Sequence, residues 1–268
     1  MGKYRCIFCG SAEKLTREHI WPNWLRAYVP RVEIDGRKNR HLMRTSDGEI
    51  REGKLNRPGH TAAQRLQVVC RRCNNGWMSE LQEAAKRVIV PLLSGDWANL
   101  DTTAQGILAR WSIMFSMVFE HCRPSTTAIP QAHRTYLMES KDVPPDWVVW
   151  IGRCTFGVSN PNSNHHRGQI FVPPSKPADP PEVFCFQSTG FTVGPLFFQT
   201  LMLTPSSAPY RFYADAFATE FDLRVIHPPA SVLQEGPSTP LTWERFYEAT
   251  NIFAAVLGAG GFSTPDPT

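Results

Sequence analysis

The sequence contains no long uninterrupted hydrophobic run, and its first residues do not show the pattern expected of a secretory leader. The first ten residues, MGKYRCIFCG, lack the apolar stretch of a signal peptide, so we expect a cytoplasmic protein. Residues 183–210 carry no charged side chain, but glutamine, serine, glycine and proline interrupt them. A membrane-spanning helix rarely accepts such interruptions, so we expect buried strands here and no membrane segment.

Acidic residues are scarce in the first third of the chain. Residues 1–90 carry 18 Lys and Arg against 9 Asp and Glu, a net charge of +9. The remaining residues carry 10 against 15, a net charge of −5. Such asymmetry is typical of a chain whose first part meets a polyanion such as nucleic acid. A basic surface that is simply solvated is the alternative that charge alone leaves open.

Helical periodicity is limited to a few segments, and most of the 23 prolines lie in the second half of the chain. Helices are predicted from residue 74 to about 92 and over 101–122, 130–140 and 242–257. Strands are predicted over 66–69, 147–158, 169–172, 183–187, 197–203, 211–217 and 221–226. We also expect a hairpin over 4–10 and a long loop or weak hairpin over 31–63. The chain is therefore predicted to be α+β, with a boundary near residue 95 and a helix-plus-antiparallel-strand domain over 96–268.

Four of the seven cysteines form two C-x-x-C pairs, Cys6 with Cys9 and Cys70 with Cys73. Without a secretory signal, such pairs indicate metal ligands rather than disulfides. Four thiolates complete a closed tetrahedral zinc site, which is structural because no position remains for water. Unmetallated thiols are the alternative. The other cysteines have apolar neighbours and are predicted to be inert core thiols: Cys122, Cys154 and Cys185.

A possible second site combines Glu18, His19 and Asn74. Pro22 disfavours helix just before it, so Glu18 and His19 are expected on extended chain, where adjacent side chains point apart. Asn74 follows the last cysteine and begins a helix. A carboxylate and an amide oxygen suit Mg²⁺ or Mn²⁺, and His19 is suited to deprotonate a water. Asn75 is the alternative ligand to Asn74.

These residues together resemble the zinc-containing HNH endonucleases. That family carries a C-x-x-C pair, an acidic-His dipeptide, and a second C-x-x-C followed directly by Asn or His at a helix start. The resemblance covers about residues 4–90, and its specific elements are the two cysteine pairs, Glu18-His19 and Asn74. The sequence is also similar to bacterial proteins that carry the strings EHIWPNWL and CRRCNNGWMSEL.

The resemblance implies a ββα-metal nuclease module in residues 1–95, with His19 as general base. It also implies that Glu18 and Asn74 bind one catalytic Mg²⁺ or Mn²⁺, and that the substrate is double-stranded DNA, although the residues themselves leave RNA open. A role in bacterial defence rests on the resemblance alone. Two positions depart from the family pattern. Glu18 stands where Asp is usual, and Arg65 stands where many members have an Asn, so no residue is expected to orient the general base.

Several further interpretations concern partners and individual residues. Arg71 or Arg72 is expected to contact phosphate, and the Arg37–Arg44 segment to contribute to binding. Trp77 and Met78 are expected to pack, His41 and His60 to be solvated, and His165-His166 to form an exposed turn. The alternative function is a non-catalytic zinc module, a degenerate HNH that binds nucleic acid or protein. Residues 96–268 are expected to serve regulation, a partner or homo-oligomerisation.

Overall fold

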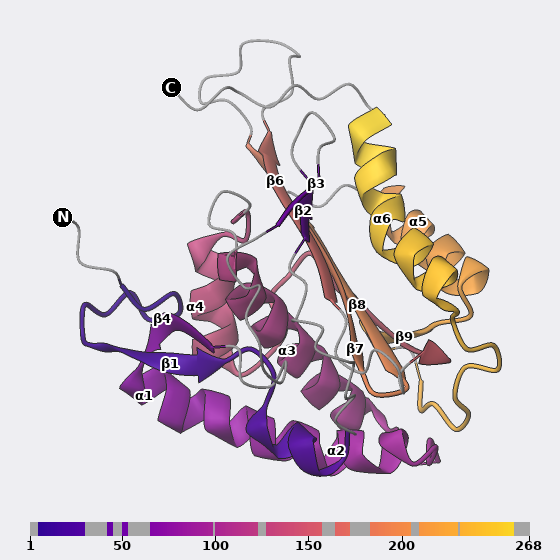
Figure 1. Cartoon of the computed structure of the whole chain (residues 1–268), viewed down its shortest axis with the longest axis horizontal. Coiled ribbons are helices and arrows are strands. Elements are labelled where there is room, and N and C mark those ends of the chain that lie inside the picture. Colours follow the sequence, from indigo (N-terminus) through magenta and orange to yellow (C-terminus); the bar gives the residue numbers. More distant parts are fainter. Residues whose placement is uncertain are drawn as a thin grey trace.

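The computed structural model describes ten segments of the chain, which contain every element discussed below. These segments are 5–29, 42–44, 50–52, 65–98, 100–122, 127–156, 164–171, 183–204, 209–229 and 231–259. They form an α+β structure in which helices cover both faces of an antiparallel sheet (Figure 1). The coarse class predicted from the sequence, α+β, is therefore confirmed.

The N-terminal part pairs two strands that lie far apart in sequence. Strand β1 (Leu15–His19) runs antiparallel to β4 (Arg65–Cys70), with a register shift between Thr16 and Glu18. The short 3-10 helix η1 (Asn23–Ala27) follows β1. Between the two strands, β2 (Leu42–Arg44) and β3 (Ile50–Glu52) form a hairpin, as the weak-hairpin alternative predicted.

A helical segment starts directly after β4 and carries Asn74. It consists of α1 (Arg71–Cys73), the π-type turn η3 (Asn74–Met78) and α2 (Ser79–Leu93). Within η3 the backbone of Gly76 leaves the helical region, with φ −97° and ψ −117°. A π-type turn holds more residues than an α-turn, so it shifts the helical phase. The buried residues of α2 are spaced by three and four along one side of the helix, at Leu81, Ala85, Ile89 and Leu92.

The second part contains a five-stranded antiparallel sheet with strand order β6-β7-β8-β5-β9. The strands are β5 (Trp147–Arg153), β6 (Asn164–Phe171), β7 (Phe184–Val193), β8 (Leu196–Thr204) and β9 (Arg224–His227). Residues 184–204, most of the uncharged stretch, form strands β7 and β8, and buried strands were predicted here. Within the described residues, no helix has the length and apolar character needed to cross a bilayer.

Alternate residues of the sheet face two separate cores, because side chains alternate along a strand. On one face, Val149 and Ile151 belong to the cluster that contains α3 (Thr102–Phe119). On the other face, Val148 and Trp150 pack with α5 (Pro209–Glu220) and α6 (Trp243–Ala259). Figure 1 shows α5 and α6 on one side of the sheet and α3 with α4 (Gln131–Ser140) on the other.

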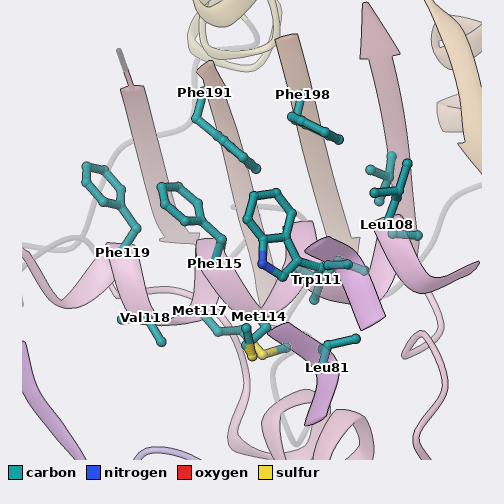
Figure 2. Close-up of a cluster of buried hydrophobic side chains, with 14 of the residues drawn as sticks. Leu81, Leu108, Trp111, Met114, Phe115, Met117, Val118, Phe119, Phe191 and Phe198 are labelled. Carbon is teal, nitrogen blue, oxygen red and sulfur yellow. The ribbon is translucent and has the colours of Figure 1, made fainter. Parts of the chain in front are cut away.

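Helix α3 is central to the larger core. Asp101 caps it by accepting a hydrogen bond from the Ala104 backbone at 2.7 Å. Its aromatic side chains meet the sheet, with Phe115 stacked on Phe191 at 4.1 Å between ring centroids and Trp111 edge-on to Phe198 at 5.6 Å (Figure 2). The same cluster contains residues of the N-terminal part, including Trp21, whose ring lies 4.8 Å from that of Phe115.

Three sequence interpretations are wrong. Residues 211–217 lie in helix α5 rather than a strand. The described part of the predicted 4–10 hairpin is a tight turn, in which Gly10 donates to the Cys6 carbonyl. His165 and His166 lie on strand β6 and are half-buried, not in an exposed turn. Burial and the nearby Arg167 lower the pKa of His165 to about 4, and the His166 ring hydrogen-bonds Thr189 at 2.7 Å.

Candidate functional site

The four cysteines of the two pairs converge, although 61 residues separate Cys9 from Cys70. Cys6 and Cys9 lie on the turn after the N-terminus, Cys70 ends β4, and Cys73 ends α1. Their sulfurs lie within 4.8 Å of one another, and Cys9 Sγ is 3.6 Å from Cys70 Sγ. Four sulfurs at ~2.3 Å from one tetrahedral zinc would lie about 3.8 Å apart. The cluster is therefore compatible with a structural zinc site.

The environment of the thiols fits the same interpretation. Burial raises the pKa of Cys9, but hydrogen bonds from the Ser11 backbone and from the neighbouring cysteine sulfurs outweigh it and lower the pKa to about 7. Burial raises the pKa of Cys73, and the closeness of Cys6 raises it further. Because a metal ligates thiolates, a bound cation would remove this mutual repulsion. The Arg72 side chain hydrogen-bonds the Cys9 sulfur, so this arginine is directed to the cluster.

Glu18 and Asn74 meet beside this cluster. Glu18 points inward from β1 and is only 8% exposed. The Asn74 side chain donates from Nδ2 to the Thr16 hydroxyl at 3.0 Å, and it also hydrogen-bonds the Glu18 carboxylate. Burial raises the pKa of Glu18 to about 7, despite the hydrogen bond from Asn74. A cation bound nearby would stabilise the ionised form of this buried carboxylate and so lower its pKa.

His19 points away from Glu18 and meets Arg65. The two residues are directly opposite in the β1–β4 pairing, and Arg65 Nε donates to His19 Nε2 at 3.0 Å. Burial lowers the pKa of His19, and the charges of Arg65 and Arg26 lower it further, so the imidazole is held neutral. Arg65, which stands where many members of the resembled family have an Asn, thus contacts the His19 ring, a contact that the sequence did not predict.

A cleft of about 390 Å³ opens over these side chains. Its lining includes Glu18, His19 and Asn74, the three residues selected from the sequence. Asn75, the alternative ligand, also lines the cleft. The other lining residues were not selected from the sequence, and they come from Pro22, η1, η3 and α2. These further lining residues are Pro22, Asn23, Trp24, Met78, Ser79, Gln82 and Glu83. The sequence contained one signal for these residues. Ser79, Gln82 and Glu83 are spaced so that they lie on one side of a helix.

The remaining predicted residues have mixed outcomes. Trp77 packs edge-on against Phe8 at 4.9 Å between centroids, and Met78 is buried, as predicted. Arg71 is exposed. His41, His60 and residues 37–41 of the Arg37–Arg44 segment lie outside the described residues. All seven cysteines are free; Cys154 is buried, and Cys122 and Cys185 are half-buried.

Comparison with known proteins adds no relative. No family model matches the chain, and no curated protein or solved structure matches it either.

Proposed function

We propose that this protein is a metal-dependent endonuclease that hydrolyses phosphodiester bonds in DNA, with a zinc-stabilised ββα-metal module in residues 1–95. The observation that carries the proposal is the convergence of Glu18, His19 and Asn74 at one cleft beside the four-cysteine cluster. In this module β1 and β4 are the two strands, and the segment from Arg71 to Leu93 is the helix. The resemblance to HNH endonucleases rests on the same residues.

Glu18 and Asn74 are the residues that would hold the catalytic cation. Both offer oxygen atoms, which Mg²⁺ and Mn²⁺ prefer, and the two side chains already touch. Such a cation, when bound, stabilises negative charge on the scissile phosphate and on the leaving oxygen. The buried position of Glu18 supports this role, because an ionised carboxylate in such a place needs a positive partner.

His19 is suited to remove a proton from the attacking water. A general base must be neutral before it acts, and burial with Arg65 and Arg26 keeps the imidazole in that form. Arg65 occupies Nε2, so the ring proton resides on Nδ1 in this arrangement. In the proposed reaction Arg65 turns from the ring to the phosphate, which frees Nε2 for the water and places a positive charge on the developing anion.

The test is a set of single substitutions assayed on plasmid DNA with Mg²⁺ or Mn²⁺, and with EDTA as the metal-free reference. His19→Ala should reduce cleavage by about 10²–10⁴-fold, the usual contribution of a general base. Glu18→Gln and Asn74→Ala should reduce it as well, and a tenfold higher metal concentration should partly restore these two but not His19→Ala.

The matched control is Glu80→Gln, which makes the same chemical change at an exposed position of α2 outside the cleft. It should cleave at the wild-type rate. Near-wild-type cleavage by His19→Ala would contradict the assigned base. If the wild type binds DNA but cleaves it with neither metal, the chain is the alternative, a non-catalytic zinc module that binds nucleic acid.

A further inference from the structure

The cleft extends well beyond the three residues assigned to the chemistry. Along the helical segment its lining extends from Asn74 in η3 to Glu83 in α2, roughly two turns further along the chain at ~3.6 residues each. The other wall includes Asn23 and Trp24 of η1. One cation and one phosphate group occupy only part of such a length, so the remainder is available to another part of the substrate.

The lining of this remainder does not suit a phosphate backbone. Among the described residues, no lysine or arginine lines the cleft, whereas grooves that follow a phosphate backbone are positively charged. The nearby cations, Arg65 and Arg26, lie instead beside His19, where they act on its ring. The scissile phosphate therefore belongs on the His19 side, and the part that enters the far end of the cleft is uncharged.

Gln82 and Glu83 bring hydrogen-bond donors and acceptors to the far end of the cleft. Gln82 Oε1 accepts a hydrogen bond from the buried Trp111 indole at 2.9 Å. This contact fixes the amide of Gln82 and leaves its NH₂ group, with two donors, for a ligand. The neighbouring Glu83 carboxylate offers acceptors in the same cleft. Nucleobases present both donors and acceptors on the edges that become accessible when they are unpaired.

Trp24 adds an aromatic ring to the same space. Trp24 lines the cleft, and its ring lies edge-on to that of Tyr28, with 6.3 Å between centroids. Aromatic side chains bind unpaired bases of any sequence by stacking. The volume of about 390 Å³ falls at the lower end of the ~300–1,000 Å³ found for sites that enclose small molecules.

We propose that the cleft between η1 and α2 binds one unpaired nucleobase of the substrate strand, with Trp24 as its stacking platform and Gln82 and Glu83 at its edge. The preferred substrate is therefore DNA with a nucleotide outside the helical stack, such as a single strand or a duplex with a bulged base. This inference builds on the proposed nuclease function, but the binding of the base needs no metal.

The experiment measures binding of the full-length protein to three fluorescent DNAs by anisotropy, without added Mg²⁺ or Mn²⁺. The DNAs are a single strand, its fully paired duplex, and the same duplex with one unpaired nucleotide. The wild type should bind the single strand and the bulged duplex at least about 10-fold more tightly than the paired duplex, and Trp24→Ala should remove this preference. Trp24→Phe keeps a ring and should retain most of it, which separates stacking from damage to the fold.

Tyr136→Ala is the matched control, because this tyrosine is 42% exposed on α4 and does not line the cleft. It should behave as the wild type. The inference would be overturned if the wild type bound paired and unpaired DNA with equal affinity. It would also be overturned if Trp24→Ala and Tyr136→Ala reduced the preference for unpaired DNA equally.

Cleavage assays on the same DNAs separate the two proposals. If the protein prefers unpaired DNA in a Trp24-dependent way but cleaves no DNA with any metal, the nuclease proposal is wrong and the base-binding site is supported. If the protein cleaves paired and bulged duplexes at the same rate, and Trp24→Ala does not change that rate, the nuclease proposal is supported and the base-binding proposal is wrong.

Discussion

At the scale of single residues, the pairing of His19 with Arg65 depends on the register of two strands. His19 and Arg65 are opposite each other only because the β1–β4 register shifts between Thr16 and Glu18. Strand alternation was enough to predict that Glu18 and His19 point apart. The register shift has no local signature in the sequence, so the partner of His19 could not be predicted from it.

Arg65→Ala tests the dual role assigned to this arginine. Loss of the guanidinium should lower the cleavage rate at saturating DNA by about 10–100-fold, less than His19→Ala, with a smaller change in DNA affinity. Arg65→Lys should recover part of the rate, because an ammonium group keeps the charge but not the planar fork. Added guanidinium should restore part of the activity of Arg65→Ala and none of His19→Ala. A full wild-type rate for Arg65→Ala would exclude both roles.

At the scale of elements, the sequence pattern was a good guide to long periodic segments and a poor one to short apolar runs. The helices over 101–122 and 242–257 were predicted because their apolar residues repeat over several turns. Residues 211–217 were predicted to form a strand, but periodicity over so short a run does not separate strand from helix. Buried Ala214, Phe217 and Phe221 are spaced by three and four, which is the helical solution that packing against the sheet selects.

The turn between α5 and β9 depends on Asp222. Its backbone is left-handed, with φ 46°. Its carboxylate accepts hydrogen bonds from the Ser238 hydroxyl at 2.7 Å, the Thr239 backbone at 2.6 Å and Arg224 at 2.9 Å. Burial raises the pKa of Asp222, but these partners lower it to about 2. The charged form is therefore favoured in the folded state, and its stabilisation is present above pH 3.8 and lost as the pH falls toward 2.

Asp222→Asn should lower the free energy of unfolding by roughly 1–2 kcal/mol, after a discount because the side chain is partly exposed. Asparagine tolerates the left-handed backbone, so the change isolates the charge. Denaturant unfolding at pH 5 and pH 8 should give the same difference from wild type, since both values lie above the titration window. Asp215→Asn, at an exposed aspartate of α5, is the control and should have little effect. A difference that grows between pH 5 and pH 8 would point to another group.

At the scale of the whole molecule, the cysteine cluster is connected to the rest of the core. The backbone carbonyl of Phe8, between Cys6 and Cys9, accepts a hydrogen bond from Gln131 of α4 at 3.0 Å. Cys73 lies 3.8 Å from the sulfur of Met138 on the same helix. One hydrophobic cluster contains residues from both sides of position 95, and α3 packs against α2 as well as against β8 and β9. The separation into two domains at residue 95 stays a prediction.

This connection determines how the protein should respond when the cluster is broken. The full chain should contain one equivalent of zinc, and Cys6→Ser or Cys73→Ser should remove it. Because structural zinc contributes ~10–16 kcal/mol to the folding of small zinc domains, each substitution should cost several kcal/mol. The loss should appear as a lower midpoint of one cooperative thermal transition, since the core is shared. Cys185→Ser, at a half-buried free thiol on β7, is the control and should keep both the bound zinc and the wild-type midpoint.

Well-folded protein with less than half an equivalent of zinc would contradict the assignment of the four cysteines as zinc ligands. An early transition that leaves the sheet folded would instead contradict the coupling, because the N-terminal part would then melt independently of α3 and the five-stranded sheet.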